Sequence, residues 1–235
     1  MSRTPWLPGV HATPNLQDAP ETYELENRAA DPEGLIWEAL DEIHPWEDQL
    51  VVDLGAGSGF HVPRFAQRAR HVYAVEPHGP SRLLAMERLL RLGLTNASVL
   101  IGSAEHTGLQ SDSMDLVVAR FAYFWGPGCE QGLQEVDRIL RPGGALIVVD
   151  NDLQQGTFAQ WLQRAYPRDR GAVESFWRSK GFQARTVATC WRFQRREELE
   201  AVVHNEFRDH APVLLDQHTG LEIQVGLRLF WRCFD

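Results

Sequence analysis

A run of closely spaced glycines in the first half of the chain could hold a ligand against the backbone. Residues 51–60 read VVDLGAGSGF, so a short apolar stretch leads into Gly55, Gly57 and Gly59. Glycine adopts backbone angles that other residues avoid, and its missing side chain lets a ligand approach the main chain. We therefore expect a buried strand, a tight turn and a helix here, with a cofactor resting on the turn.

Two classes of cofactor bind to such a turn, and the neighbouring residues favour one of them. A dinucleotide site has the spacing G-x-G-x-x-G, which requires glycine or alanine where this chain has Phe60. Asp53 lies two residues before Gly55, where its carboxylate would repel a pyrophosphate. S-adenosylmethionine carries no phosphate, and its ammonium and sulfonium groups suit a nearby carboxylate. The loop therefore favours S-adenosylmethionine over a nicotinamide dinucleotide.

A second carboxylate stands where a ribose could be held. Glu76 follows the apolar run 71–75, about twenty residues after the glycine turn. A carboxylate in this place accepts hydrogen bonds from the ribose hydroxyls of a nucleoside cofactor. Both cofactor classes contain ribose, so Glu76 supports a nucleoside site without separating the two.

The elements that must position these residues alternate between strand and helix. Continuous runs of Val, Leu and Ile indicate buried strands, and apolar residues at helical spacing indicate helices between them. Strands are expected at 50–54, 71–75, 97–101, 115–119 and 145–149, and helices at 33–44, 61–70, 80–92 and 130–140. This order predicts a parallel sheet covered by helices on both faces.

The pattern changes after residue 150. Helices are expected at 158–165, 172–180 and 196–206, and strands at 183–193 and 221–234. The last strand alternates apolar and polar residues, which is typical of an antiparallel or more exposed strand. The proline-rich residues 1–20 are expected to form an extended arm or loop.

Several segments in this order resemble the class I S-adenosylmethionine-dependent methyltransferases, and most closely the ubiquinone/menaquinone-biosynthesis-like branch, methyltransferase type 11. Residues 51–60 and 73–77 (YAVEP) resemble the first two motifs of that family. Residues 102–106 (GSAEH) with 113–117 (SMDLV) resemble its adenine-contacting stretch and fourth strand. Residues 140–146 (LRPGGAL) resemble the turn before its fifth strand, and the likeness covers about residues 45–150.

The resemblance implies a Rossmann-like α/β fold. Its doubly wound sheet would have seven strands in the order 3-2-1-4-5-7-6, with strand 7 antiparallel. The chain would then divide into an N-terminal arm and helix, residues 1–44, and a methyltransferase domain, residues 45–235. In related proteins such an arm covers the cofactor, so we expect residues 10–30, with Tyr23 and Asn27, to act as a lid.

The resemblance also implies which residues hold the methionine end of the cofactor. Asp53, Gly55 and Gly57, with Ala56 between the glycines, would surround it. Arg120, directly after the fourth strand, would present its backbone carbonyl to the amino group.

The nucleoside end has its own set of implied contacts. Glu76 would bind the ribose, and Pro77 would flank the adenine. Ala104 would offer its backbone N–H to the adenine ring. Ser103 departs from the family, which often has Asp there; a hydroxyl accepts a hydrogen bond from the adenine amino group more weakly than a carboxylate, and Glu105 could substitute.

The segment after the fourth strand, residues 120–127 (RFAYFWGP), faces the expected substrate side. Methyltransferases that act on the amino groups of adenine or glutamine typically carry Asn/Asp-Pro-Pro-Tyr/Phe here, so those activities are disfavoured. Tyr123, Phe124 and Trp125 could line an apolar or aromatic substrate pocket, or could simply pack beneath the sheet.

Catalytic groups are weakly marked, because methyl transfer needs mainly an aligned nucleophile and a dry site. A hydroxyl or carbon nucleophile also needs a base. His61, His106 and Tyr123 are the candidates, although lone histidines more often lie on the surface or in a satisfied core. The sequence has no HExxH or HxH pair, and residues 150–152 (DND) read as a polar loop, so no metal is expected.

Composition narrows the environment and the partners. A net charge of −9 argues against nucleic-acid binding, which normally needs a basic face. No apolar run approaches the roughly 18 residues of a membrane span. The start of the chain lacks a signal-peptide pattern, and three distant cysteines without a CxxC pair suit a reducing cytosol, so a cytoplasmic location is expected.

The sequence therefore predicts a methyltransferase that uses S-adenosylmethionine to modify a small molecule. Two other readings stay open. A non-catalytic S-adenosylmethionine-binding or regulatory protein would keep every motif and lack turnover. An NAD(P)-dependent oxidoreductase would need the glycine spacing that Phe60 interrupts.

Overall fold

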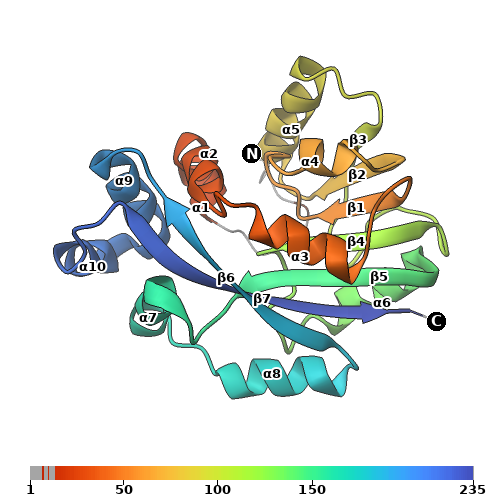
Figure 1. The fold of residues 1–235 in the computed structure, drawn as a ribbon. Coiled ribbons are helices and arrows are strands. Elements are labelled where there is room, and N and C mark those ends of the chain that lie inside the picture. The colour runs from red at the N-terminus through yellow and green to blue at the C-terminus, as the bar shows by residue number, and fades with distance from the viewer. Residues whose placement is uncertain (1–6, 8–9, 11–13, 235) are drawn as a thin grey trace.

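A single seven-stranded sheet forms the centre of the molecule (Figure 1). The computed structural model describes residues 7, 10 and 14–234. The strands are β1 (Leu50–Leu54), β2 (His71–Glu76), β3 (Ala97–Ile101), β4 (Met114–Arg120), β5 (Leu140–Asn151), β6 (Gln183–Arg192) and β7 (Glu222–Cys233). Their order is β3-β2-β1-β4-β5-β7-β6, with β7 antiparallel to both of its neighbours and β1 to β5 parallel. The expected strand order and the antiparallel β7 are confirmed.

Helices cover both faces of this sheet. They are α1 (Pro14–Asp18), α2 (Pro20–Ala29), α3 (Leu35–Ile43), α4 (Val62–Ala66), α5 (Gly79–Arg91), α6 (Glu130–Ile139), α7 (Gly156–Ala165), α8 (Arg170–Ser179), α9 (Arg196–Phe207) and α10 (Ala211–Asp216), with a 3₁₀ turn at Arg208–His210. No described helix is both long enough and apolar enough to cross a membrane.

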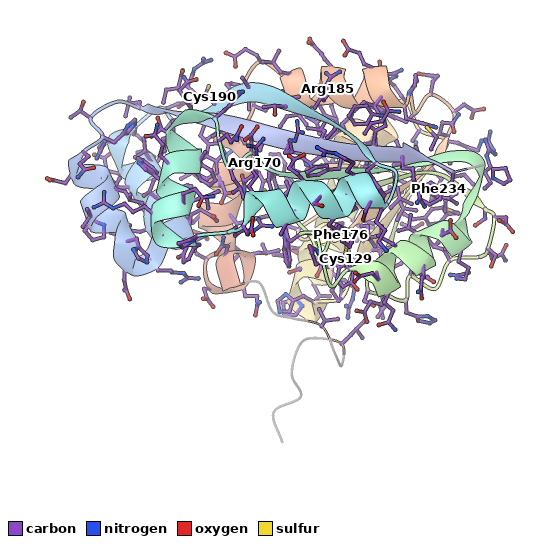
Figure 2. All side chains as sticks on the ribbon, turned by 90° about the horizontal axis from the view of Figure 1, so that it is seen from below. Cys129, Arg170, Phe176, Arg185, Cys190 and Phe234 are labelled. Carbon is purple, nitrogen blue, oxygen red and sulfur yellow. The ribbon has the colours of Figure 1, made fainter. Side chains whose placement is uncertain are left out.

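The pleat of the strands divides the buried residues into two cores. Val51 of β1 belongs to the core under α3, α4, α7 and α9, whereas the next residue, Val52, belongs to the core under α6 and α8. Successive side chains of a strand point to opposite faces, so an all-apolar strand fills both cores. Figure 2 looks onto the second face, where Phe176 of α8 and Cys129 at the start of α6 contribute to the same core.

The N-terminal arm differs from the sequence prediction. Residues 14–18 and 20–29 are helices, whereas residues 1–20 were expected to be extended; residues 1–6, 8–9 and 11–13 of that prediction lie outside the described residues. The prediction was wrong because proline also occurs in the first turn of helices: Pro14 and Pro20 are the first residues of α1 and α2. In the first helical turn the missing proline N–H has no intrahelical partner to lose, and its fixed φ suits a helix.

Two smaller differences lie towards the C-terminus. Strand β5 begins at Leu140, so residues 141–144 belong to this strand and do not form the expected turn before it. The start of β5 is irregular, because its register against β4 shifts between Met114 and Leu116. The 3₁₀ turn and α10 fill residues 208–216, where no element was predicted.

Candidate functional site

A cavity of about 600 Å³ opens at the carboxyl ends of the central strands. Asp53 from β1, Glu76 from β2 and Arg120 from β4 lie on its wall. Parallel strands present their carboxyl ends at one edge of the sheet, and the chain reverses its winding between β1 and β4, which leaves a crevice there. The volume is within the range of about 300–1,000 Å³ typical of small-molecule sites.

The glycine loop forms the floor of this cavity. The backbone N–H groups of Gly55 and Ala56 both donate to the carbonyl of Val75, at 2.9 and 3.1 Å, which ties the loop to β2. Gly55 and Gly57 have φ of +80° and +56°. A Cβ atom on Gly55 would lie 2.4 Å from the Cβ of Ala122. Both the backbone angle and the close approach therefore require glycine at position 55.

Glu76 joins the end of β2 to the glycine loop. Its Oε2 accepts a hydrogen bond from the Gly57 N–H and its Oε1 accepts one from the His78 N–H, both at 2.8 Å. The side chain is buried, and burial raises its pKa, while the two N–H groups and the Arg82 guanidinium lower it. Each oxygen keeps accepting capacity that a ligand hydroxyl can use, because a carboxylate oxygen has two lone pairs.

Asp53 and Arg120 place opposite charges on the wall near the loop. Burial raises the pKa of Asp53 to about 7, the nearby Glu76 adds to this rise, and the Arg120 charge opposes it. The Arg120 guanidinium lies over the Trp37 ring at 5.3 Å from its centroid, and burial lowers its pKa. The sequence identified Arg120 through its backbone carbonyl, whereas the structure brings its side chain to the cavity as well.

The residues expected at the adenine end also line the cavity. Pro77, Ser103, Ala104 and Glu105 lie on its wall. Ser103 begins a tight turn in which its N–H donates to the carbonyl of His106 at 2.9 Å. The structure thus brings all the cofactor residues named from the sequence to one cavity. Their contacts with a cofactor stay predictions.

The aromatic run after β4 separates into two environments. Tyr123 and Trp125 line the cavity, but Phe124 is 1% exposed and packs in the core against the Tyr123 ring at 5.1 Å. Tyr123 and Phe121 have φ of +58° and +51°, a region that bulky side chains rarely adopt. Such strain collects where a backbone must aim side chains at a site.

The three catalytic candidates differ in position and protonation. His61 lines the cavity; burial and the charges of Arg120 and Arg88 hold its pKa well below the usual range, so the ring is neutral. Its Nε2 lies 3.1 Å from Oδ1 of Asn27. An amide oxygen only accepts, so Nε2 carries the proton.

The other two candidates are poorly suited to act as a base in this cavity. The Tyr123 hydroxyl donates to Glu105 at 2.7 Å, and burial with this bond raises its pKa. It therefore stays protonated at neutral pH. His106 is exposed and does not line the cavity. The described residues contain no group of three or more His, Cys, Asp or Glu side chains arranged to hold a metal ion.

Helix α2 lines the cavity beside the glycine loop and contacts the loop in ways that the sequence did not reveal. Glu24 accepts a hydrogen bond from the Ser58 hydroxyl and forms an ion pair with Arg88 at 2.6 Å. Arg88 also donates to the Ser58 carbonyl at 3.0 Å. Tyr23 and Asn27, which the sequence did single out, line the cavity from the same helix.

The end of the cavity formed by α2 and α9 was also missed. Glu26 and Glu206 both line it, and burial raises the pKa of each carboxyl, to about 7 for Glu206. Asn15 donates a hydrogen bond to Glu206. These residues are up to 191 positions apart, and only the fold brings them together, so no spacing could have signalled the pair.

The fold and the motifs are similar to those of the class I S-adenosylmethionine-dependent methyltransferases. Residues 52–148 match the methyltransferase domain family, and the glycine loop, Glu76 and the Ser103 turn all lie within that match.

Part of the chain is also similar to curated methyltransferases. An uncharacterized methyltransferase of Mycobacterium tuberculosis H37Rv is 37% identical over 114 residues, which are 48% of this chain and 44% of the relative. A malonyl-[acyl-carrier protein] O-methyltransferase of Coxiella burnetii is 29% identical over 97 residues, 41% of this chain and 32% of the relative. The chain thus matches less than half the length of these curated relatives.

Solved structures extend the likeness in fold across most of the chain. A methyltransferase assigned to an antibiotic biosynthesis pathway of Anabaena variabilis has a TM-score of 0.62 at 20% identity, covering 88% of this chain and 98% of that one. A SAM-dependent methyltransferase of Aquifex aeolicus has a TM-score of 0.56 at 17% identity, covering 89% and 98%. At this identity the likeness establishes the fold.

Proposed function

We propose that the protein transfers a methyl group from S-adenosylmethionine to a small molecule bound in the cavity at the carboxyl ends of β1, β2 and β4. The observation that carries the proposal is the meeting of the glycine loop, Glu76 and Asp53 on one wall of this cavity. The loop offers a surface without side chains, Glu76 offers acceptors for ribose hydroxyls, and Asp53 offers a carboxylate for the ammonium group.

The residues present fit the positively charged amino-acid end of the cofactor. Oδ2 of Asp53 is buried and has no hydrogen-bond partner among the described residues, so its side chain lacks a donor that a ligand ammonium group would supply. S-adenosylmethionine supplies a methyl group on a positively charged sulfur when it is bound.

In the part of the cavity that would hold the methyl acceptor, the chain's residues mainly position that molecule and shield it from water. Tyr123 and Trp125 contribute ring surface, and Tyr123 is held by its bond to Glu105. Arg168 donates to the Trp125 carbonyl at 3.0 Å and pairs with Asp150 at 3.3 Å, which fixes the loop after β4. Because Tyr123 stays protonated and its proton is donated to Glu105, it would orient a methyl acceptor by accepting a hydrogen bond and would not remove that acceptor's proton.

We also propose that residues 1–44 act as a cover for the cofactor on the domain of residues 45–235. The Glu24, Ser58 and Arg88 contacts support this role, because they join α2 to the glycine loop.

The cysteines bear on the compartment in which the protein works. The buried free thiols Cys129 and Cys190 suit a reducing compartment such as the cytoplasm.

Calorimetry with S-adenosylmethionine, S-adenosylhomocysteine and NADH tests the cofactor. We expect the first two to bind and NADH not to bind; absence of S-adenosylmethionine binding at high micromolar concentration would contradict the proposal. A screen of metabolite pools with a labelled methyl donor then tests turnover. Binding without any labelled product would instead favour a non-catalytic, regulatory protein.

A further inference from the structure

Two oppositely charged side chains, one buried and one half-buried, belong to residues that line the same cavity from neighbouring strands. Asp53 lies in β1 and Arg120 ends β4, and the two parallel strands pair with Asp53 opposite Val118. Asp53 is 3% exposed. Burial acts on the pKa of both groups in the direction that disfavours charge, and each group's charge stabilises the charge of the other.

Neither side chain satisfies the other. No ion pair within 4.0 Å joins Asp53 and Arg120 in the described structure. Oδ2 of Asp53 has no hydrogen-bond partner there, and neither have Nε and Nη1 of Arg120. Buried charged groups without partners are strongly unfavourable, so a ligand that pairs with both side chains would stabilise this arrangement.

The other groups near Arg120 are engaged elsewhere or uncharged. Oδ1 of Asp31 accepts from the Leu35 N–H at 2.9 Å and from the Thr189 hydroxyl at 2.9 Å, and its Oδ2 accepts from the Ile36 N–H at 3.0 Å. Burial raises the pKa of Tyr23, so it stays a neutral phenol. The Trp37 ring attracts the guanidinium but leaves its in-plane N–H groups unused.

We infer that Asp53 and Arg120 form a receptor for a zwitterion, in which the Arg120 guanidinium holds the α-carboxylate of the cofactor's amino-acid end and Asp53 holds its α-ammonium group. The inference rests on the proposed function and adds a role for the Arg120 side chain that differs from that of its backbone carbonyl. An α-amino acid carries one charge of each sign a few bonds apart, which matches two unpaired opposite charges in one wall. The guanidinium fork binds a carboxylate with two parallel hydrogen bonds, and ligands that lack the carboxylate lose both.

The experiment compares two ligands by calorimetry on the full chain. S-adenosylhomocysteine contains the amino-acid end, whereas methylthioadenosine keeps the nucleoside and lacks that end. We expect Arg120→Gln to weaken S-adenosylhomocysteine binding by about 30-fold or more, as for the loss of a charge-assisted pair. We expect the same substitution to change methylthioadenosine affinity less than about twofold. Arg120→Lys should lie between the wild type and Arg120→Gln, since it keeps the charge without the fork.

Arg64→Gln is the matched control. Arg64 also lies over the Trp37 ring, at 5.5 Å, but it is exposed and does not line the cavity. It should leave both affinities unchanged. If Arg120→Gln retains wild-type affinity for S-adenosylhomocysteine, the inference is wrong, and Arg120 faces the acceptor instead.

A measurement on the unmodified protein protects the test against a misfolded variant. The wild type should bind decarboxylated S-adenosylhomocysteine about 30-fold or more weakly than S-adenosylhomocysteine. Equal affinities would overturn the inference while leaving the proposed function intact. Failure of the wild type to bind any of the three nucleosides would instead overturn the proposed function.

Discussion

The carboxylate of Glu76 accepts a hydrogen bond from the backbone N–H of Gly57 at 2.8 Å, so the end of β2 is tied directly to the turn after β1. The same carboxylate accepts from the His78 N–H. One side chain therefore fixes the loop that carries the cofactor residues and also offers acceptors to the cavity. Removing its charge should affect both tasks.

Glu76→Gln is expected to weaken S-adenosylhomocysteine binding by about 10- to 100-fold. An amide has only one accepting oxygen, so its NH₂ group would face one of the two N–H donors that now bind the carboxylate. Titration calorimetry measures the change. Glu87→Gln on the exposed side of α5 is the control, and an affinity for Glu76→Gln equal to the control would refute a ribose-binding role.

Gly55 and Gly34 form a matched pair of positive-φ glycines. Their φ angles are +80° and +79°, but a Cβ on Gly55 would meet Ala122 at 2.4 Å, whereas a Cβ on Gly34 would meet no atom within 4 Å. Gly34→Ala should cost about 1 kcal/mol of unfolding free energy, the ordinary penalty of the left-handed region, and leave cofactor binding intact.

Gly55→Ala should cost more, because the loop or the segment at Ala122 must move in addition. Urea titrations give the two free energies of unfolding. We expect Gly55→Ala to exceed Gly34→Ala by about 1–3 kcal/mol and to lose cofactor binding. Equal costs would mean that the loop can shift freely.

The positions of the strands and of the glycine turn could be predicted because both follow from local sequence, whereas the strand order was implied by the family resemblance. Apolar runs such as residues 50–54 and glycines at fixed spacing mark a strand and a turn wherever they occur. In that order the parallel strands β2, β1 and β4 are neighbours, so their carboxyl ends bring Asp53, Glu76 and Arg120 to one edge of the sheet.

The contacts of α2 with the glycine loop and the far end of the cavity join residues that are distant in sequence, and no local pattern encodes them. Asn15 and Glu206 are 191 positions apart. Phe124 and Trp125 are adjacent in sequence, yet one is in the core and the other at the cavity. The strained backbone at Tyr123 decides which ring points where, and composition alone carries no sign of it.

Helix α2 should set how long the cofactor stays bound. Glu24→Gln removes the negative charge that pairs with Arg88 at 2.6 Å and weakens the bond from Ser58. Because both partners are largely shielded from solvent, we expect the dissociation rate of S-adenosylhomocysteine to rise about 3- to 10-fold. Stopped-flow displacement measures this rate. Glu21→Gln, exposed on the same helix, should leave it unchanged; similar rates for both variants would argue against a lid.

The Glu26 and Glu206 carboxyls should make the empty protein less stable as the pH rises. Burial raises the pKa of both, to about 7 for Glu206, above the ordinary value near 4.5 that applies after unfolding. The folded protein therefore binds protons more tightly than the unfolded chain, and this contribution to stability is lost as the pH rises from about 4.5 through 7.

Glu206→Gln removes part of that dependence, because an amide stays neutral while keeping its contact with Asn15. Thermal unfolding at pH 5.5 and pH 8 tests this expectation. The fall in Tm between the two values should be smaller in Glu206→Gln than in the wild type by about 2–4 °C. Arg208 partly offsets the negative charge, so its presence limits the effect. An identical fall in both proteins would show that the pair is not protonated near neutral pH.

Cofactor affinity should depend on pH through Asp53. Its pKa in the empty protein is about 7, so below that pH the side chain is largely protonated. A ligand ammonium group favours the ionised form, so binding releases the proton and the affinity rises with pH until it levels off above about 7. Between pH 6 and pH 8 we expect about a tenfold increase for S-adenosylhomocysteine.

Glu76 also has a raised pKa, and the choice of ligand separates the two carboxyls. Methylthioadenosine keeps the ribose and lacks the ammonium group, so a rise caused by Glu76 would appear with both ligands. A rise caused by Asp53 appears with S-adenosylhomocysteine alone and disappears in Asp53→Asn.

Asp53→Asn should also make the ligand-free protein more stable at pH 8, by about 1–3 kcal/mol of unfolding free energy. The reason is that the wild type buries a carboxylate whose Oδ2 has no hydrogen-bond donor among the described residues. Lost affinity together with gained stability would show that Asp53 is kept for the ligand and not for the fold.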